Sequence, residues 1–423
     1  MPTQKLNFDA LISPVRAEDF FSDYWERAPL HVRRGLPEAY APLLDLADLD
    51  YLTSVALRMP ETLVESLGDP AAGPYVVRPV TAPSELYDAC ARGASFRLRG
   101  LHRYWKPLRD LSRSLEQKFA CAVGVNLYSS PASAQGLDRH YDNHDVLVLQ
   151  IAGRKNWRLH DPIVRLPLKH APPTSFERRV EELEYFRGGP MRSRGRLTDE
   201  ETGRPTHELT MEQGDLLYLP RGFVHEARAE GAASVHLTIG LHVTTWLDLL
   251  AVALGQLAQR DERFRRSLPV GVLHDAGAAS RADFDALVEA FASGASLRDA
   301  LTEVAEGFVR TRDDAGDGAL LGGAGNVDDA SKVGLETLLE RRPGLVCRVV
   351  VEADSVGLAS ARGALWMPKP FEAALVFVAR AEEFRPRDIP GGVSEAGRLA
   401  LARRLIQDGF VRVAAAREQS REE

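Results

Sequence analysis

The sequence predicts a chain built mainly of β-strands that form a double-sheet barrel, followed by a helical region and a small C-terminal unit. Three observations carry this prediction. Short strand-like segments separated by glycine and proline turns fill residues 122–243. Apolar side chains then recur at helical spacing over residues 246–312. Beyond a stretch rich in Gly, Asp and Ala, short strand-like and helical segments alternate.

Length and composition limit the organisation and the partners of the chain. Its 423 residues exceed one ordinary domain, and we expect units at 1–245, 246–330 and 331–423. Hydrophobic residues make up 44% and charged residues 27%, as in soluble globular proteins rather than disordered ones. The net charge of -7 opposes a broadly basic surface, so direct nucleic-acid binding is not expected.

Cysteine usage and hydropathy indicate the compartment. Cys90, Cys121 and Cys347 lie far apart and match neither a zinc spacing nor a disulfide framework, which is typical of a reducing compartment. The N-terminus has no basic stretch followed by a long apolar run, and no apolar run approaches the roughly 20 residues of a membrane span. We therefore expect a cytoplasmic protein that does not enter a membrane.

The elements of the first half follow from side-chain alternation. Ahead of the barrel we expect a helix at 17–25, a short strand at 29–32 and an amphipathic helix at 113–121. The barrel strands are expected at 122–128, 145–151, 156–159, 216–220 and 234–243, with a turn at 152–154. In the first of these strands, Asn126 and Tyr128 share a face. The polar stretch 163–210 lacks a core pattern and is expected to be a loop-like insertion that borders a cleft.

The helical region carries an apolar stripe that a barrel alone need not bury. The stripe includes Leu249, Leu250, Val252, Leu254 and Leu257. We expect a homodimer through this region, and folding of the helices onto the barrel of the same chain is the alternative. Ser280 and Ser296 suit helix N-caps, and residues 313–331 suit a linker.

The C-terminal unit has an element order that is compatible with a small winged helix. The expected strands lie at 347–352, 364–367 and 410–413, and the expected helices at 371–381 and 394–408. Winged helices also serve as protein-docking units, so this unit does not by itself indicate binding to DNA.

Metal chemistry is indicated first by the segment RHYD at residues 139–142. Residues two apart in a strand project to the same face, so His140 and Asp142 can reach one metal ion. With a second histidine they make the facial triad that holds iron(II) and leaves three coordination positions open. An H-x-D triplet alone is weak, because it also occurs in hydrogen-bonded surface turns.

A second segment strengthens the metal hypothesis. GDLLYLPRGFVH, residues 214–225, runs from a glycine turn through an apolar strand and a proline stop to a histidine. This order returns a strand beside the first one and delivers His225 as the third ligand. The two segments together predict an iron site formed by His140, Asp142 and His225.

At this point the chain resembles the ribosomal oxygenase branch of the JmjC/cupin family. The motifs are YWERAPLHVR, NLY followed by SAQGLDRHYD, VLVLQIAGRKNWRL, GDLLYLPRGFVHEA, SVHLTIGLHV and, more weakly, LARRLIQDGFV. The resemblance implies a mainly β jelly-roll (cupin/JmjC) oxygenase domain with an α-helical dimerisation region and a C-terminal winged-helix unit. The stretch between Asp142 and His225 is longer than usual for this branch, which leaves the substrate open.

The resemblance also implies roles for single residues. Positions that match the iron ligands are His140, Asp142 and His225. Positions that match the lining of the co-substrate pocket are Asn126, Tyr128 and, more weakly, Thr238, with ordinary barrel packing as the alternative. Lys155 matches the position that binds the distal carboxylate of 2-oxoglutarate. A lysine inside a barrel requires an anionic partner, whereas Arg154 is the expected solvent-facing neighbour.

Other ring side chains are expected to have structural roles. His144 shares a face with His140 if the strand is regular, so it is a rival ligand, but we expect it at the rim of the pocket. His236 and His242 are expected to be hydrogen-bonded core residues, and Trp157 is expected in the core.

The implied activity is hydroxylation of a protein side chain with Fe(II), 2-oxoglutarate and O2, in which 2-oxoglutarate is converted to succinate and carbon dioxide. The resemblance implies a histidine or arginine of a ribosomal protein as the substrate. The alternatives are the same chemistry on another peptide or a natural product, demethylation of a methylated lysine or arginine, and a non-catalytic cupin scaffold.

Overall fold

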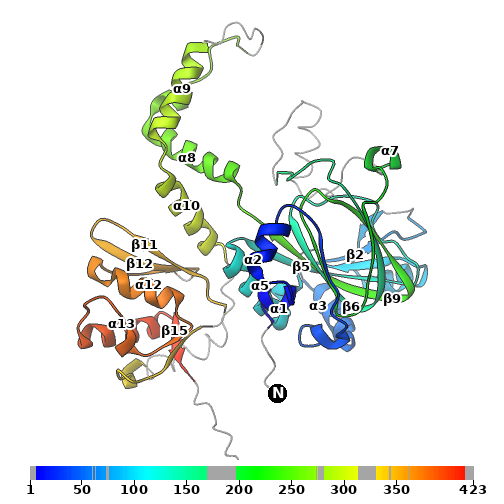
Figure 1. The fold of residues 1–423 in the computed structure, drawn as a ribbon, viewed down its shortest axis with the longest axis horizontal. Coiled ribbons are helices and arrows are strands. Elements are labelled where there is room, and N and C mark those ends of the chain that lie inside the picture. Colours follow the sequence, from blue (N-terminus) through cyan, green and yellow to red (C-terminus); the bar gives the residue numbers. More distant parts are fainter. Residues whose placement is uncertain are drawn as a thin grey trace, which may run out of the picture. The chain divides into compact units, whose positions relative to one another are not determined.

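The structure is a computed structural model of the chain. It describes residues 6–59, 61, 63–72, 76–168, 197–272, 274, 281–312, 330–342, 344–361 and 363–414. Contacts divide the chain into two compact units, Met1–Val243 and Thr244–Glu423 (Figure 1). The second unit holds both the helical region and the C-terminal sheets, and the predicted division into three domains remains a prediction.

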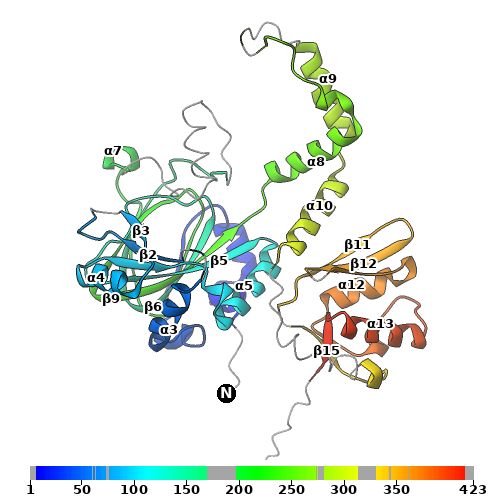
Figure 2. The same cartoon turned by 180° about the vertical axis from the view of Figure 1, so that it is seen from behind.

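The first unit contains a large antiparallel sheet of nine strands that wraps into a barrel (Figures 1 and 2). The strands are β1 (Leu30–Val32), β2 (Val64–Leu67), β3 (Val77–Pro79), β4 (Ser95–Leu98), β5 (Ala122–Ser130), β6 (Asp145–His160), β7 (His207–Met211), β8 (Leu216–Leu219) and β9 (Val224–His242). Their order is β1-β8-β6-β9-β5-β4-β2-β3, with β7 paired to β6. The predicted jelly-roll barrel is therefore confirmed.

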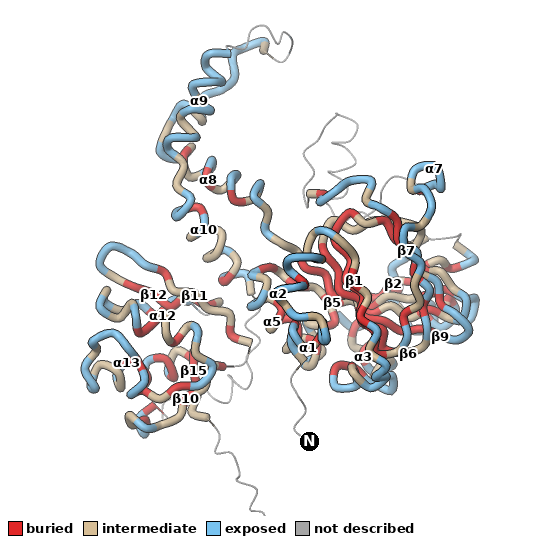
Figure 3. Tube along the Cα trace, viewed as in Figure 1, coloured by how far each residue is buried: buried red, intermediate tan, exposed pale blue. Residues whose placement is uncertain are grey.

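Alternation along the strands separates two apolar clusters. Leu127, Leu149 and Leu237 face the larger cluster, which the N-terminal helices complete with residues such as Leu11 and Leu108. The opposite face of β6 packs Val148, Trp157 and Leu159 into a smaller cluster inside the barrel. Trp157 is only 4% exposed, so its predicted place in the core is confirmed. Figure 3 shows the buried strands beneath exposed loops.

Short helices accompany the barrel. They are α1 (Phe8–Ile12), α2 (Ala17–Asp19), η1 (Phe20–Tyr24), η2 (Pro37–Tyr40), η3 (Leu46–Asp48), α3 (Leu49–Ala56), α4 (Pro83–Ala91), η4 (Leu101–Arg103), α5 (Lys106–Phe119) and α7 (Asp199–Thr202). The helix predicted at 17–25 is a short α-helix followed by one π-turn, and the helix predicted at 113–121 begins earlier, at Lys106.

The predicted turn at 152–154 is wrong, because β6 continues through these residues as one strand. Its pairing with β9 shifts register between Gln150 and Ala152 and again between Ala152 and Arg154. Gly153 has a φ of 67°, in the left-handed region that glycine adopts without strain. The glycine therefore makes a β-bulge, which bends the strand rather than ending it.

The loop predicted at 163–210 is corrected at its end. Residues 207–211 form β7, which pairs with β6 from Lys155 to Leu159. Just before it, Thr198 caps α7 by accepting a hydrogen bond from the Glu201 backbone N–H. Residues 169–196 lie outside the described part of the chain.

The second unit begins with helices. They are α8 (Trp246–Arg260), η5 (Glu262–Arg265), α9 (Arg281–Gly294) and α10 (Leu297–Arg310). Leu249 and Ala253 of α8 pack with Ala300 of α10, so part of the apolar stripe is buried within the unit. Ser296 caps α10 as predicted, whereas Ser280 and residues 313–329 lie outside the described residues. No helix in the described ranges is long and apolar enough to cross a membrane.

Two small sheets and further helices complete this unit. The elements are β10 (Leu339–Arg341), β11 (Cys347–Val351), β12 (Ser355–Ser360), β13 (Gly363–Pro368), η7 (Lys369–Phe371), α12 (Glu372–Arg380), β14 (Glu383–Phe384), η8 (Pro386–Asp388), α13 (Glu395–Gln407) and β15 (Val411–Val413). The sheets run β14-β10-β15 and β11-β12-β13. The helices and strands predicted here are confirmed, whereas β10, β12 and β14 are additional strands that the sequence pattern did not predict. That this unit is a winged helix remains a prediction.

Candidate metal centre

Two histidines and one carboxylate converge inside the barrel. One ligand atom from each of His140, Asp142 and His225 lies within 4.8 Å of the others. His140 and His225 face each other across an isolated antiparallel bridge, with N···O distances of 3.1 and 2.8 Å. The Nε2 atom of His225 lies 3.8 Å from Oδ2 of Asp142. Segments 83 residues apart, from residue 142 to residue 225, thus meet at one point.

The backbone that presents Asp142 differs from the predicted regular strand. His140 takes part in a single bridge, and Asp142 follows it outside any strand. The Asp142 carbonyl instead accepts a hydrogen bond of 2.9 Å from the Gly222 N–H. Gly222 has a φ of 92°, and a Cβ atom there would lie 2.2 Å from the Val164 carbonyl oxygen. Only glycine suits this turn, which places the carboxylate beside His225.

Backbone carbonyls orient both imidazole rings. The Nδ1 atom of His140 lies 2.7 Å from the Asp138 carbonyl oxygen, and that of His225 lies 3.0 Å from the Phe223 carbonyl oxygen. Each Nδ1–H that donates to a carbonyl leaves the Nε2 lone pair available to a metal ion. Burial lowers the pKa of His225 to about 4, so its ring is neutral at physiological pH.

The charge state of Asp142 also suits a cation. Burial acts to raise the pKa of Asp142, but attraction to His144, His140 and His225 outweighs it, and the pKa is lowered overall. The side chain is therefore a carboxylate at neutral pH. Imidazole nitrogens with one carboxylate are suitable ligands for iron(II), so this donor set fits the metal that the sequence predicts.

Lys155 lies in the barrel interior, where its ammonium group contacts two polar side chains. Its side chain is buried, and Nζ contacts Ser130 Oγ at 3.2 Å and His236 Nδ1 at 3.4 Å. Among the described residues no carboxylate pairs with it, and burial lowers the pKa of Lys155 to about 7. Arg154 points the other way: its side chain is 54% exposed and pairs with Glu212 and Glu230. The structure thus places these neighbours on the faces that the sequence predicts.

Tyr128 and Asn126 lie on β5 beside this interior. The Tyr128 ring stacks on His236 with a centroid distance of 5.0 Å and an interplanar angle of 4°. The Asn126 side-chain oxygen accepts a hydrogen bond of 3.1 Å from the Gly100 N–H. Asn126 also lines an open pocket with Glu61 and Arg103, whose lining includes none of the proposed metal ligands. Thr238 is the direct partner of Asn126 in the pairing of β5 with β9.

One polar residue near the site was not predicted. Arg97 donates from Nη1 to the Tyr128 hydroxyl at 3.1 Å and forms an ion pair with Glu65. It lies in β4, within the short segment SFRL, where a single arginine gives no sign of its burial. The cross-strand pairing of Arg97 with Tyr128 brings it to the site, and such pairing is set by tertiary structure.

Of the histidines expected in the core, His236 is buried as predicted, whereas His242 is only partly buried, which corrects the prediction. His144 lies outside the group of three converging ligands and stacks on His242 at a centroid distance of 4.6 Å. It also packs closely on β9, because a Cβ atom at Gly240 would lie 2.7 Å from its ring. His236 is buried, and burial together with Lys155 holds its pKa well below the ordinary value.

A jelly-roll barrel whose interior joins two histidines and a carboxylate next to a buried lysine defines a cupin-type metal-binding protein. Residues 103–249 match the JmjC domain. The predicted resemblance to the JmjC family is therefore confirmed over this part of the chain.

Curated relatives carry related names. Ribosomal oxygenase 1 of Gallus gallus is 33% identical over 296 residues, which are 67% of this chain and 45% of that protein. The bifunctional lysine-specific demethylase and histidyl-hydroxylase NO66 of Aedes aegypti is 30% identical over 273 residues, 63% of this chain and 40% of that protein. Ribosomal oxygenase 2 of Mus musculus is 30% identical over 285 residues, which are 62% of this chain and 54% of that protein. The chain thus spans about half the length of these relatives.

Solved structures show the same fold. The ribosomal oxygenase YcfD of Escherichia coli superposes with a TM-score of 0.56 at 18% identity, covering 95% of this chain and 99% of that chain. The complex of YcfD with cobalt and 2-oxoglutarate superposes with a TM-score of 0.54 over the same shares.

Proposed function

We propose that this chain is an iron(II)- and 2-oxoglutarate-dependent hydroxylase of a protein side chain. The observation that carries the proposal is the convergence of His140, Asp142 and His225 inside a JmjC-type barrel. Two imidazole nitrogens and one carboxylate are the ligand set of non-haem iron(II) oxygenases, and they leave positions for 2-oxoglutarate and O2. The names of the relatives and the cobalt and 2-oxoglutarate bound to YcfD support the same chemistry.

The residues of the chain hold and orient the reacting groups. His140, Asp142 and His225 would hold iron(II), with the carbonyls of Asp138 and Phe223 fixing the two imidazoles. Iron(II) with 2-oxoglutarate and O2 supplies the oxidising power for hydroxylation of a C–H bond and yields succinate and carbon dioxide.

Lys155 would bind the distal carboxylate of 2-oxoglutarate. A buried ammonium group whose neighbours are Ser130 and His236 is stabilised by an anion brought into the same cavity. Asn126, Tyr128 and Thr238 would line this pocket.

The proposed metal site is tested by removing its ligands. Purified protein should bind about one iron(II) per chain, and His140→Ala or Asp142→Ala should lose most of that affinity, since each removes one of three protein ligands. The metal content after dialysis measures the stoichiometry, and calorimetric titration measures the affinity for iron(II). The assignment is wrong if both variants keep full iron affinity and 2-oxoglutarate turnover.

The proposed substrate is a histidine or arginine side chain of a ribosomal protein. The relatives named ribosomal oxygenase support this class, and the name histidyl-hydroxylase favours histidine. Intact-mass comparison of ribosomal proteins from cells with and without the gene should show one protein lighter by a single oxygen in the absence of the gene.

The insertion between Asp142 and His225 keeps another peptide or a natural product as the second candidate substrate, because long loops often border a substrate cleft. Capture of a ribosomal protein by the Asp142→Ala variant supports the first candidate, whereas unchanged ribosomal masses support the second. Loss of a methyl group instead of gain of oxygen would indicate demethylation, which one relative's name also includes.

The remaining parts of the proposal concern the oligomeric state and the cellular compartment. We infer a homodimer formed by the helices of the second unit and a winged-helix unit at the C-terminal end, and the net charge of -7 argues against direct binding to nucleic acid. The isolated cysteines support a reducing compartment, for which we propose the cytoplasm.

A further inference from the structure

Arg139 precedes a proposed metal ligand and differs from the other outward-facing arginines of the barrel. Its side chain is 12% exposed, whereas those of Arg154 and Arg158 are 54% and 59% exposed. Exposed cross-strand ion pairs such as Arg158 with Glu208 contribute little to stability. A largely buried guanidinium group instead requires a defined set of partners, and its removal leaves those partners without a charge to pair with.

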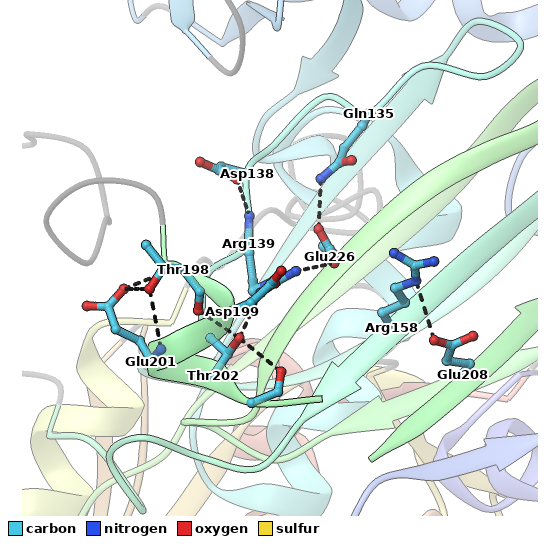
Figure 4. A network of polar contacts seen from close by, with 11 residues as sticks. Gln135, Asp138, Arg139, Arg158, Thr198, Asp199, Glu201, Thr202, Glu208 and Glu226 are labelled. Atoms are coloured by element: carbon cyan, nitrogen blue, oxygen red, sulfur yellow. Dashed lines mark hydrogen bonds and ion pairs between the residues drawn. The ribbon is translucent and has the colours of Figure 1, made fainter. Parts of the chain in front are cut away.

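The partners of Arg139 come from two separate elements (Figure 4). Its Nη2 donates to Glu226 Oε1 of β9 at 2.9 Å. Its Nη1 donates to Asp199 Oδ1 and Thr202 Oγ1 of α7, each at 2.7 Å. The second oxygen of Glu226 accepts a hydrogen bond of 3.3 Å from Gln135, so this carboxylate is held on both sides.

The strand register connects this network to the metal centre. His140 pairs with His225, so Arg139 stands opposite Glu226 on the other face of the same two segments. The backbone bridge between the histidines is isolated rather than part of a ladder. The Arg139–Glu226 ion pair adds a side-chain link between the two segments, one residue away from each imidazole.

The network also fixes the position of α7. This helix has only four residues, too few to be stable without tertiary contacts. Asp199 is 90% exposed, and its bond to Arg139 connects α7 to the segment that carries His140. The helix lies shortly after residues 169–196 in the sequence, within the polar stretch 163–210.

We propose that Arg139 is a positioning residue that couples α7 to the metal centre: it holds the spacing between His140 and His225 through Glu226, and it does so fully only while α7 is docked. The proposal rests on the metal site proposed above. It assigns α7 a role in metal affinity, because α7 supplies two of the three partners of Arg139.

Cobalt(II) titration of the full chain, followed by its visible absorption bands and by calorimetry, tests the coupling. Arg139→Ala should weaken cobalt binding about ten-fold, in the range that is typical when groups supporting metal ligands are lost. Arg139→Lys should recover part of the affinity because one ion pair survives. Arg158→Ala, which breaks the exposed pair with Glu208 in the same sheet, should leave cobalt affinity unchanged.

Asp199→Ala provides a second test in case Arg139→Ala does not fold. Asp199 is 90% exposed, so its replacement should not prevent folding. This variant should weaken cobalt binding two- to three-fold, by about 0.4–0.7 kcal/mol, and should speed hydrogen exchange of the Gly203 N–H, which bonds to the Asp199 carbonyl. Unchanged cobalt affinity in both Arg139→Ala and Asp199→Ala overturns the coupling while the metal site stands. A wild-type chain that binds no cobalt overturns the metal site and the coupling together.

Discussion

At the scale of single residues, the first prediction concerns Lys155, which we propose binds the distal carboxylate of 2-oxoglutarate. A charge-assisted hydrogen bond from its ammonium group to a carboxylate in a partly dry pocket is worth roughly 1.5–3 kcal/mol. Lys155→Ala should therefore weaken 2-oxoglutarate binding about ten-fold to a hundred-fold, while metal affinity stays nearly constant because Lys155 is not a ligand. Calorimetric titration of 2-oxoglutarate into the metal-loaded protein measures the first affinity, and titration of the metal into the metal-free protein measures the second.

The control for this prediction is the neighbouring side chain. Arg154→Ala should leave the affinity for 2-oxoglutarate unchanged, since Arg154 pairs with Glu212 and Glu230 at the surface. A defect in the Arg154 variant together with normal binding by Lys155→Ala would show that the pocket lies on the other face of β6.

The same lysine predicts a pH dependence of 2-oxoglutarate binding. Burial lowers the pKa of Lys155 to about 7 in the ligand-free protein, so above that pH the bound anion must draw a proton onto the lysine. Affinity should be constant below pH 7 and fall by up to about ten-fold per pH unit above it. His236 and His225 add no slope there, because both have lowered pKa values and stay neutral.

Titrations at pH 6.5, 7.5 and 8.5 test this dependence. Lys155→Arg keeps its charge at all three values and should bind with nearly constant affinity. An equally steep fall for Lys155→Arg would assign the pH dependence to another group.

The proposed metal ligands could be predicted from the sequence, whereas the polar residues that surround and orient the site could not. His140, Asp142 and His225 could be proposed because their residue types, together with the strand and turn signals around them, limit the possible geometry. The low exposure of Arg97 and Arg139 could not be proposed, because a lone arginine looks the same in a sequence whether it is exposed or buried. It depends on the pairing of β4 with β5 and on the contacts of Arg139 with Glu226 and α7.

At the scale of elements, Gly153 shows how one signal supports two structures. A glycine between two apolar segments predicts a turn, yet here it makes a bulge within β6. An added Cβ atom would lie 2.1 Å from the Ala233 carbonyl oxygen, in addition to the cost of a positive φ. Gly153→Ala should therefore destabilise the barrel by more than the roughly 1–2 kcal/mol of backbone strain alone, and should weaken 2-oxoglutarate binding by displacing Lys155.

Gly231→Ala separates strain from steric overlap. Gly231 has a similar φ of 73°, but no atom lies within 4 Å of an added Cβ. Its substitution should cost only the strain and leave 2-oxoglutarate binding intact. Equal losses of unfolding free energy for both variants, measured by denaturant titration, would contradict a tight bulge at Gly153.

Strong patterns make the longer elements predictable, whereas short strands such as β2, β3 and β4 carry no distinct pattern. The strands β5 and β8 and the helix α10 follow from alternation, a proline stop and a serine cap. The segment HELTM of β7 is polar and pairs at one edge of β6, where only the inner-facing Met211 is buried, so its sequence resembles that of a loop. β12 was missed because SVGLAS is made of small residues, and its partner strands supply the contacts.

At the scale of the whole molecule, the helices of the second unit expose apolar side chains that the unit itself leaves uncovered. Trp246, Leu250 and Leu254 of α8 are 74%, 48% and 43% exposed, and Phe284 and Val288 of α9 are 63% and 51% exposed. Apolar side chains gathered in this number mark an interaction surface. Leu249 and Leu257, in contrast, are already buried, so only part of the predicted stripe is available to a partner.

We predict that this surface pairs two copies of the chain. Light scattering at micromolar concentration should give twice the chain mass, and replacing Leu250 and Leu254 together by Lys should shift the protein to monomers, because each charge would be buried at the interface. The matched control is Leu297→Lys, on the exposed surface of α10 and outside the α8 stripe. A wild-type monomer at this concentration contradicts the dimer and favours the alternative, in which the helices fold back onto the barrel of their own chain.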